Sequence, residues 1–156
     1  MKIEIKKILC PVDFSESSEN ALRYALVLAK AHDASLDLYH VLELPAYSVP
    51  GDSEFAGLSF EYMKDVEQIC TKRLNDMARE IREEHAKVMT TIESGEPFSS
   101  IIRKARKDEA DLIVMGTHGR TGLQHVLIGS VAEKVVRKSP CPVLTVKHPE
   151  HEFVMP

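Results

Sequence analysis

Short apolar segments alternate with amphipathic segments along this chain, and that alternation restricts the fold more than any other feature. The first apolar segment, residues 3–12, ends in the continuous run Ile8-Leu9-Cys10, which is typical of a strand buried on both faces. Strands separated by helices run parallel and are joined by right-handed crossovers. The sequence therefore predicts an α/β fold, a single doubly wound sandwich with helices on both faces of a parallel sheet.

The positions of the elements follow from periodicity. Apolar runs predict strands at 3–12, 35–44, 87–93, 111–115 and 143–146. Helical spacing predicts helices after an N-cap at Ser15, over 59–86, from Pro97 onward and over 130–138. The segment 45–57 contains two prolines and two glycines and is expected to be a loop.

Length and charge exclude several classes of protein. The 156 residues fit one domain, expected at 1–148, followed by a flexible C-terminal tail at 149–156. With 20 basic and 24 acidic residues the net charge is −4, so we expect neither a nucleic acid nor a membrane as partner. The N-terminus has no apolar run of the signal-peptide kind, and a cytoplasmic location is expected.

The cysteines predict neither disulfides nor zinc. Cys10, Cys70 and Cys141 are widely spaced, odd in number and never part of a CxxC pair. They are expected to be small buried hydrophobes rather than reactive thiols.

A glycine-rich segment marks the candidate site. Gly116, Gly119, Gly122 and Gly129 are four of the seven glycines in the chain, and the predicted last helix begins directly after them, at Ser130. Glycine lets backbone N–H groups approach a ligand, and the positive end of a helix attracts anions, so the pattern favours a phosphate site. The alternative is that these glycines only shape a long connection.

Side chains of the same segment have matching chemistry. The Ser130 hydroxyl could bind a phosphate oxygen or a phosphate-bound Mg²⁺, and His118 or Arg120 could add positive charge. Neither a Walker loop nor a GxGxxG fingerprint is present.

Asp13 follows the first predicted strand, at the edge of the sheet where ligands bind in such folds. Its carboxylate could accept hydrogen bonds from a ribose hydroxyl pair. It could equally form a turn or cap the first helix. A phosphate site on the neighbouring strand favours the ribose role.

With these motifs, the chain resembles the ATP-binding branch of the universal stress proteins, the UspA superfamily. The pattern G-x2-G-x9-G-[ST] of that branch is present without a gap as Gly116, Gly119, Gly129 and Ser130. The segments ILCPVDFSESSENAL, YHVLE, GEP and SPCPVLTVK resemble further parts of the family, so that the similarity spans about residues 3–147.

The resemblance implies a five-stranded parallel sheet in the order 3-2-1-4-5, of the adenine nucleotide alpha hydrolase-like kind, and a homodimer formed through the C-terminal strand. It implies a regulatory, stress-response role with ATP, or AMP or ADP, bound together with Mg²⁺, and a protein partner of unknown identity. The nucleotide-binding residues would be Pro11, Val12, Asp13, Val41, Met115, Gly116, His118, Gly119, Arg120, Gly129, Ser130 and Val131.

Two other functions stay open. A slow ATP hydrolase or phosphotransferase would require Arg120, His118 or Ser130, yet no residue is placed to orient an attacking water. Glu43 and Glu93 are candidate acids at strand exits, and no set of histidines has the spacing of a zinc site. We therefore expect no catalytic residues and at most slow turnover. The other alternative is a dimeric interaction module that binds no nucleotide.

Overall fold

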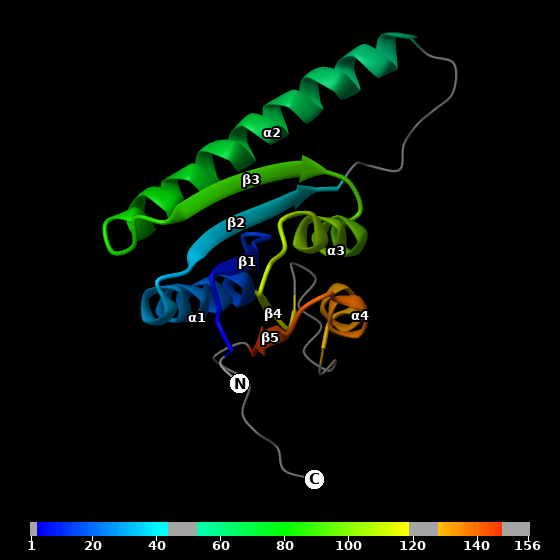
Figure 1. Cartoon of the computed structure of the whole chain (residues 1–156). Helices are drawn as coiled ribbons and strands as arrows, with labels where there is room; N and C mark the ends of the chain where they lie inside the picture. Colours follow the sequence, from blue (N-terminus) through cyan, green and yellow to red (C-terminus); the bar gives the residue numbers. More distant parts are fainter. Residues whose placement is uncertain (1–2, 44–52, 119–127, 148–156) are drawn as a thin grey trace.

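The computed structural model describes residues 3–43, 53–118 and 128–147. In these ranges, five strands form one parallel sheet in the order β3-β2-β1-β4-β5 (Figure 1). The strands are β1 Lys7–Pro11, β2 Ser35–Leu42, β3 Val88–Ser94, β4 Leu112–Gly116 and β5 Val143–Val146. The predicted fold class and strand order are therefore confirmed, although the first strand is shorter than the expected 3–12.

Four helices in the same ranges cover the two faces of the sheet. They are α1 Glu16–His32, α2 Ser53–Arg82, α3 Pro97–Lys107 and α4 Ser130–Lys138. Alternate residues of a strand pack on opposite faces of the sheet, because successive side chains of a strand point in opposite directions. Leu36 and Leu38 pack with α1 and α2, whereas Tyr39 and Val41 pack with α3 and α4. In Figure 1, α2 runs alongside β3, and α3 lies next to α4.

Side chains define where two of the helices begin. Ser15 is the N-cap of α1, as predicted, and its hydroxyl oxygen accepts the N–H of Ser18 at 3.2 Å. Glu96 caps α3, with Pro97 as the first helical residue. Both α1 and α3 thus start immediately after a strand exit, which places their N-termini at the carboxyl edge of the sheet.

The predicted loop at 45–57 is wrong in its last part, because α2 already begins at Ser53. The predicted helix at 59–86 is wrong at both ends, since α2 also stops at Arg82. One internal glycine costs a helix only about 1 kcal/mol, so Gly57 did not prevent the earlier start. At the end of the helix, the Arg82 guanidinium donates to the Val88 carbonyl of β3 at 3.1 and 3.2 Å.

Burial of the cysteines is uneven. Cys10 is fully buried, as expected, whereas Cys70 and Cys141 are only half-buried, which corrects the expectation for these two. Cys70 lies on α2 before the part of the helix that packs on the sheet, and Cys141 lies in the turn before β5. None of the helices in the described part of the chain has the length and apolar character needed to cross a membrane.

Candidate functional site

A cavity of about 550 Å³ opens at the carboxyl edge of the sheet. Its lining comes from the ends of β1, β2 and β4 and from the first turns of α1, α3 and α4. This is the edge at which doubly wound folds bind their ligands. All ten predicted site residues that the structure describes line it: Pro11, Val12, Asp13, Val41, Met115, Gly116, His118, Gly129, Ser130 and Val131.

Gly119 and Arg120, the other two predicted residues, lie outside the described residues. The predicted C-terminal tail, 149–156, lies outside them as well. The cavity therefore shows which residues come together, and their contacts with a nucleotide stay a prediction.

The turn after β1 presents Asp13 to the cavity. Its Oδ1 accepts the Ser15 N–H at 3.0 Å and the Ser15 hydroxyl at 2.5 Å, and the Asp13 N–H donates to Ser18 Oγ at 3.3 Å. Asp13 thus has the turn-forming role that the sequence left as an alternative. It also lines the cavity, so the two roles are compatible.

Helix α4 begins at the cavity without a side-chain cap. Gly129 is the N-cap residue, and its N–H donates to the Thr117 carbonyl at 2.6 Å. A Cβ on Gly129 would lie 3.1 Å from that same oxygen, a tight contact, so the two segments meet closely. The first turn of α4, beginning at Ser130, carries the N–H groups that a helix leaves without intrahelical partners, together with the positive end of its dipole.

Close packing against α1 requires glycine at position 116, which also lines the cavity. A Cβ at this position would lie 2.9 Å from both the carbonyl carbon and the carbonyl oxygen of Ser17 on α1. The close approach of β4 to α1 therefore requires glycine here. Packing thus gives Gly116 a role in addition to the predicted one, in which each glycine of the segment exposes backbone to a ligand.

Seven further residues line the cavity that sequence reasoning did not assign to it: Ser18, Tyr39, Glu43, Pro97, Ile101, Thr117 and Ala132. Glu43 and Pro97 follow strand exits, so their positions could have suggested them. Tyr39 is paired with Pro11 in the parallel register, which a strand alignment could have found.

Tyr39 belongs to a polar network beside the cavity. Its hydroxyl donates to Glu93 Oε2 at 2.7 Å, and the Arg103 guanidinium donates to Glu93 Oε1 and, at 3.2 Å, to Ser100 Oγ. Burial and the neighbouring carboxylate raise the pKa of Tyr39, so the phenol keeps its proton. Of the two candidate acids, Glu43 lines the cavity, whereas Glu93 is held by Tyr39 and Arg103 beside it.

His118 stands at the end of the described part of the glycine-rich segment. Its Nδ1 lies 3.0 Å from the Thr117 hydroxyl oxygen, within hydrogen-bond distance. Across the described ranges, no group of three histidine, cysteine or carboxylate residues could hold a metal ion. A divalent cation at this cavity would therefore need some of its ligands from a bound phosphate, with lining oxygens such as the Ser130 hydroxyl as further candidates.

Comparison with known proteins assigns the chain to a family. The model of the universal stress protein family matches residues 4–147. Universal stress protein MJ0531 of Methanocaldococcus jannaschii is 39% identical over 148 residues, which cover 94% of this chain and 85% of that protein.

Solved structures agree with that assignment. Universal stress protein UspA from Lactobacillus plantarum superposes with a TM-score of 0.84 at 26% identity, covering 93% of this chain and 99% of the other. A universal stress protein from Archaeoglobus fulgidus in complex with dAMP has the same fold, with a TM-score of 0.58 at 24% identity over 94% of this chain and 100% of the other. This chain belongs to the universal stress protein family.

Proposed function

We propose that this protein binds an adenine nucleotide in the cavity, as ATP with Mg²⁺ or as ADP or AMP, and acts as a nucleotide-dependent regulatory module in a stress response. One observation carries the proposal. The Asp13 carboxylate and the uncapped first turn of α4 line the same cavity. A nucleotide requires this pair, a hydrogen-bond acceptor for its sugar hydroxyls and N–H donors for its phosphates.

The remaining lining fits the base. Apolar surface for the base comes from four residues of the cavity lining, Pro11, Tyr39, Val41 and Met115. An aromatic base needs such surface with a few polar groups that orient it. The dAMP complex of the Archaeoglobus fulgidus protein supports the proposal, since that protein has this fold and holds an adenylate.

The ligand would divide between two parts of the chain. Asp13 would accept hydrogen bonds from the ribose, and the N–H groups that open α4 at Ser130 would hold the phosphates. Bound Mg²⁺ would neutralise phosphate charge. We propose binding with at most slow hydrolysis, in which Asp13 binds the sugar and does not activate a water.

We also propose a homodimer through β5. Within the described residues, β5 pairs with β4 alone, so its other edge presents unpaired backbone groups. Leu144 on this strand is 38% exposed. Light scattering should give twice the chain mass for the wild type, and a monomer mass for a Leu144→Glu variant that keeps its helical circular dichroism.

Calorimetry with matched ligands tests the nucleotide site. We expect Asp13→Ala to lower the affinity for ATP tenfold or more, which corresponds to about 1.4 kcal/mol of binding free energy. The affinity for tripolyphosphate should not change, because that ligand has no sugar. Gly129→Val should lower the affinity for both ligands, since the valine side chain would crowd Thr117 and the start of α4. Asp76→Ala, on the outer face of α2, is the control and should change neither.

Mass spectrometry of the purified protein gives an independent measurement, because a tightly held nucleotide co-purifies. Equal ATP affinity in the wild type and both cavity variants, with unchanged melting curves, would refute the site.

A further inference from the structure

Phe14 lies behind the cavity and links it to helices α1 and α2. It directly follows Asp13, and its side chain packs against the core on the sheet face that α1 and α2 cover. Its ring centroid is 4.5 Å from that of His40 on β2. The guanidinium carbon of Arg73 on α2 lies 4.6 Å from the Phe14 centroid, a cation–π contact.

The backbone at this point adopts an uncommon conformation. Phe14 has φ of 64°, in the left-handed region that bulky residues rarely enter. Such a conformation persists only where the surroundings over-determine it. The contacts of Phe14 therefore help the Asp13–Ser15 hydrogen bonds to keep the chain direction at this point.

Besides the hydrogen bonds of Asp13 with Ser15 and Ser18, two partners from other elements hold the turn. The His40 Nδ1–H donates to the Val12 carbonyl at 2.6 Å, while the Val12 N–H donates to the Tyr39 carbonyl at 2.8 Å. From α2, Arg73 Nη2 donates to the Phe14 carbonyl at 3.4 Å and pairs with Glu19 Oε1 of α1 at 3.4 Å. The first partner belongs to the sheet, and the second belongs to a helix whose described side chains do not line the cavity.

We propose that Arg73 is a positioning residue, which acts through Phe14 to hold Asp13 in the geometry that accepts the nucleoside, so that the seating of α2 sets nucleotide affinity. This inference rests on the proposed function. Without Arg73, Phe14 can relax toward negative φ, and the Asp13 carboxylate then turns with the backbone. Any partner that displaces the part of α2 around Arg73 would lower the affinity for the nucleotide. By reciprocity, a bound nucleotide would oppose that displacement.

The first test uses the protein without ligand. Arg73→Met removes the charge and the donor but keeps an unbranched side chain, and Arg79→Met is the matched control on the same helix. Arg79 is 73% exposed and pairs with Asp76. Amide NMR signals of Asp13 and Phe14 should shift in Arg73→Met and stay in place in Arg79→Met.

The second test measures affinity. Arg73→Met should lower the affinity for ATP three- to tenfold and leave the affinity for tripolyphosphate unchanged. Arg73→Lys should retain most of the ATP affinity. Unmoved Asp13 signals together with wild-type ATP affinity in Arg73→Met would overturn the inference and leave nucleotide binding standing.

An equal loss for ATP and tripolyphosphate would also overturn it, because it would indicate general damage to the cavity. A wild type that binds no adenylate, with Asp13 signals that still move in Arg73→Met, would instead overturn the proposed function and support the link between α2 and the turn.

Discussion

Gly116 at the end of β4 lies against Ser17 in the first turn of α1, with no room for a side chain between them. A Cβ on Gly116 would lie 2.9 Å from the Ser17 carbonyl carbon and oxygen, and both atoms belong to the backbone. The Ser17 hydroxyl is buried at this contact and has no hydrogen-bond partner among the described residues. The contact joins two walls of the cavity, because β4 supplies one wall and α1 begins at another.

A substitution at this contact should therefore act on stability. We expect Gly116→Ala to lower the free energy of unfolding by about 1–3 kcal/mol, since backbone atoms must move to admit the methyl group. Ser17→Ala should be neutral or stabilising by up to about 1 kcal/mol, because it removes an unsatisfied buried hydroxyl. Urea denaturation of both variants measures this. A Gly116→Ala protein as stable as the wild type would contradict the packing argument.

The Lys104 side chain should be far more important to stability than the lysine three positions later. Its Nζ lies 3.0 Å from Asp37 Oδ2 and 2.6 Å from Asp108 Oδ2, and Asp37 is almost fully buried. Burial opposes the charge, but the two carboxylates outweigh it and raise the pKa of Lys104. We expect Lys104→Met to lower the free energy of unfolding by about 3 kcal/mol, because the nearly buried Asp37 carboxylate would keep the Thr91 hydroxyl as a donor but lose its cation.

Lys107→Met is the control for that prediction. Lys107 is exposed on the same helix, and its substitution should change the free energy of unfolding by less than about 0.5 kcal/mol. Thermal and urea unfolding of the two variants should separate them clearly. Equal stability of the Lys104→Met and Lys107→Met variants would mean that water can replace Lys104 as the partner of Asp37.

Stability should depend on pH through Glu93. The Tyr39 hydroxyl and the Arg103 guanidinium hold the pKa of Glu93 below its ordinary value. A depressed folded-state pKa adds stability above the unfolded-state pKa, about 4.3, and that stability is lost as pH falls through the folded value. Glu93→Gln should therefore be less stable than the wild type at neutral pH, by under about 1 kcal/mol because the side chain is partly exposed.

Paired urea titrations at about pH 7 and about pH 3 check this prediction. The difference between wild type and Glu93→Gln should shrink at the lower pH. A difference of the same size at both would show that shape, and not charge, accounts for the effect.

Thiol labelling should distinguish the three cysteines. Burial, with a smaller contribution from the charge of Asp37, raises the pKa of Cys10 to about 12. At pH 8 only roughly one Cys10 thiol in ten thousand would be ionised, and reagents attack the thiolate. We expect iodoacetamide to modify the half-buried Cys70 and Cys141 first and Cys10 only upon global unfolding, as read by peptide mass spectrometry. Early labelling of Cys10 would show local opening of β1.

Periodicity in the sequence predicted most of the architecture, because buried parallel strands and amphipathic helices have distinct patterns. The expected bounds at 130–138 and 143–146 agree with α4 and β5. The early start of α2 was missed because proline and glycine before Ser53 masked the helix signal. The pair Ser53-Glu54 is typical of a helix N-terminus, so a signal for the start was present, but the neighbouring proline and glycine outweighed it.

The candidate site was only partly predictable. Asp13 and Gly129 stand out because strand exits and glycines are visible in the sequence. Ile101 was missed, since its place in the cavity depends on how α3 lies across the sheet, whereas Tyr39 required an alignment of β2 with β1. The contact of Arg73 with Phe14 also has no local signature, because 59 residues separate them and only the packed helices bring them together.

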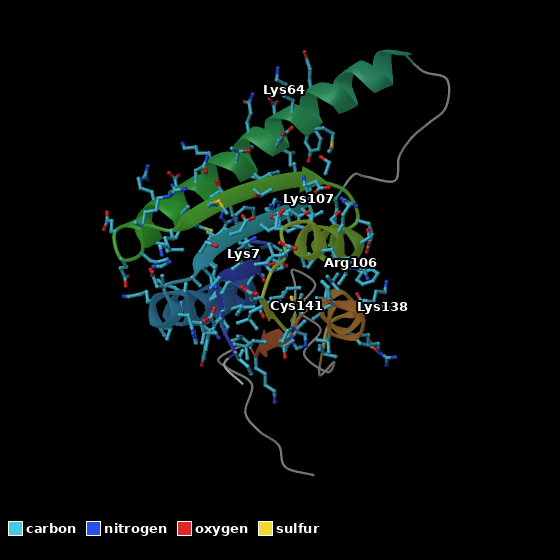
Figure 2. All side chains as sticks on the ribbon, viewed as in Figure 1. Lys7, Lys64, Arg106, Lys107, Lys138 and Cys141 are labelled. Carbon is cyan, nitrogen blue, oxygen red and sulfur yellow. The ribbon has the colours of Figure 1, made fainter. Side chains whose placement is uncertain are left out.

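Helix α2 is much longer than the strand beside it, and this gives its two halves different thermodynamic character. Thirty helical residues extend about 45 Å, whereas the seven residues of β3 extend about 23 Å. Leu74, Ala78 and Ile81 are buried, but no side chain between residues 61 and 73 is fully buried. Opening the later turns must expose the core, whereas unwinding at 61–72, before Arg73, leaves it intact. Figure 2 shows Lys64 on this stretch of α2, where a protease could cut without unfolding the sheet.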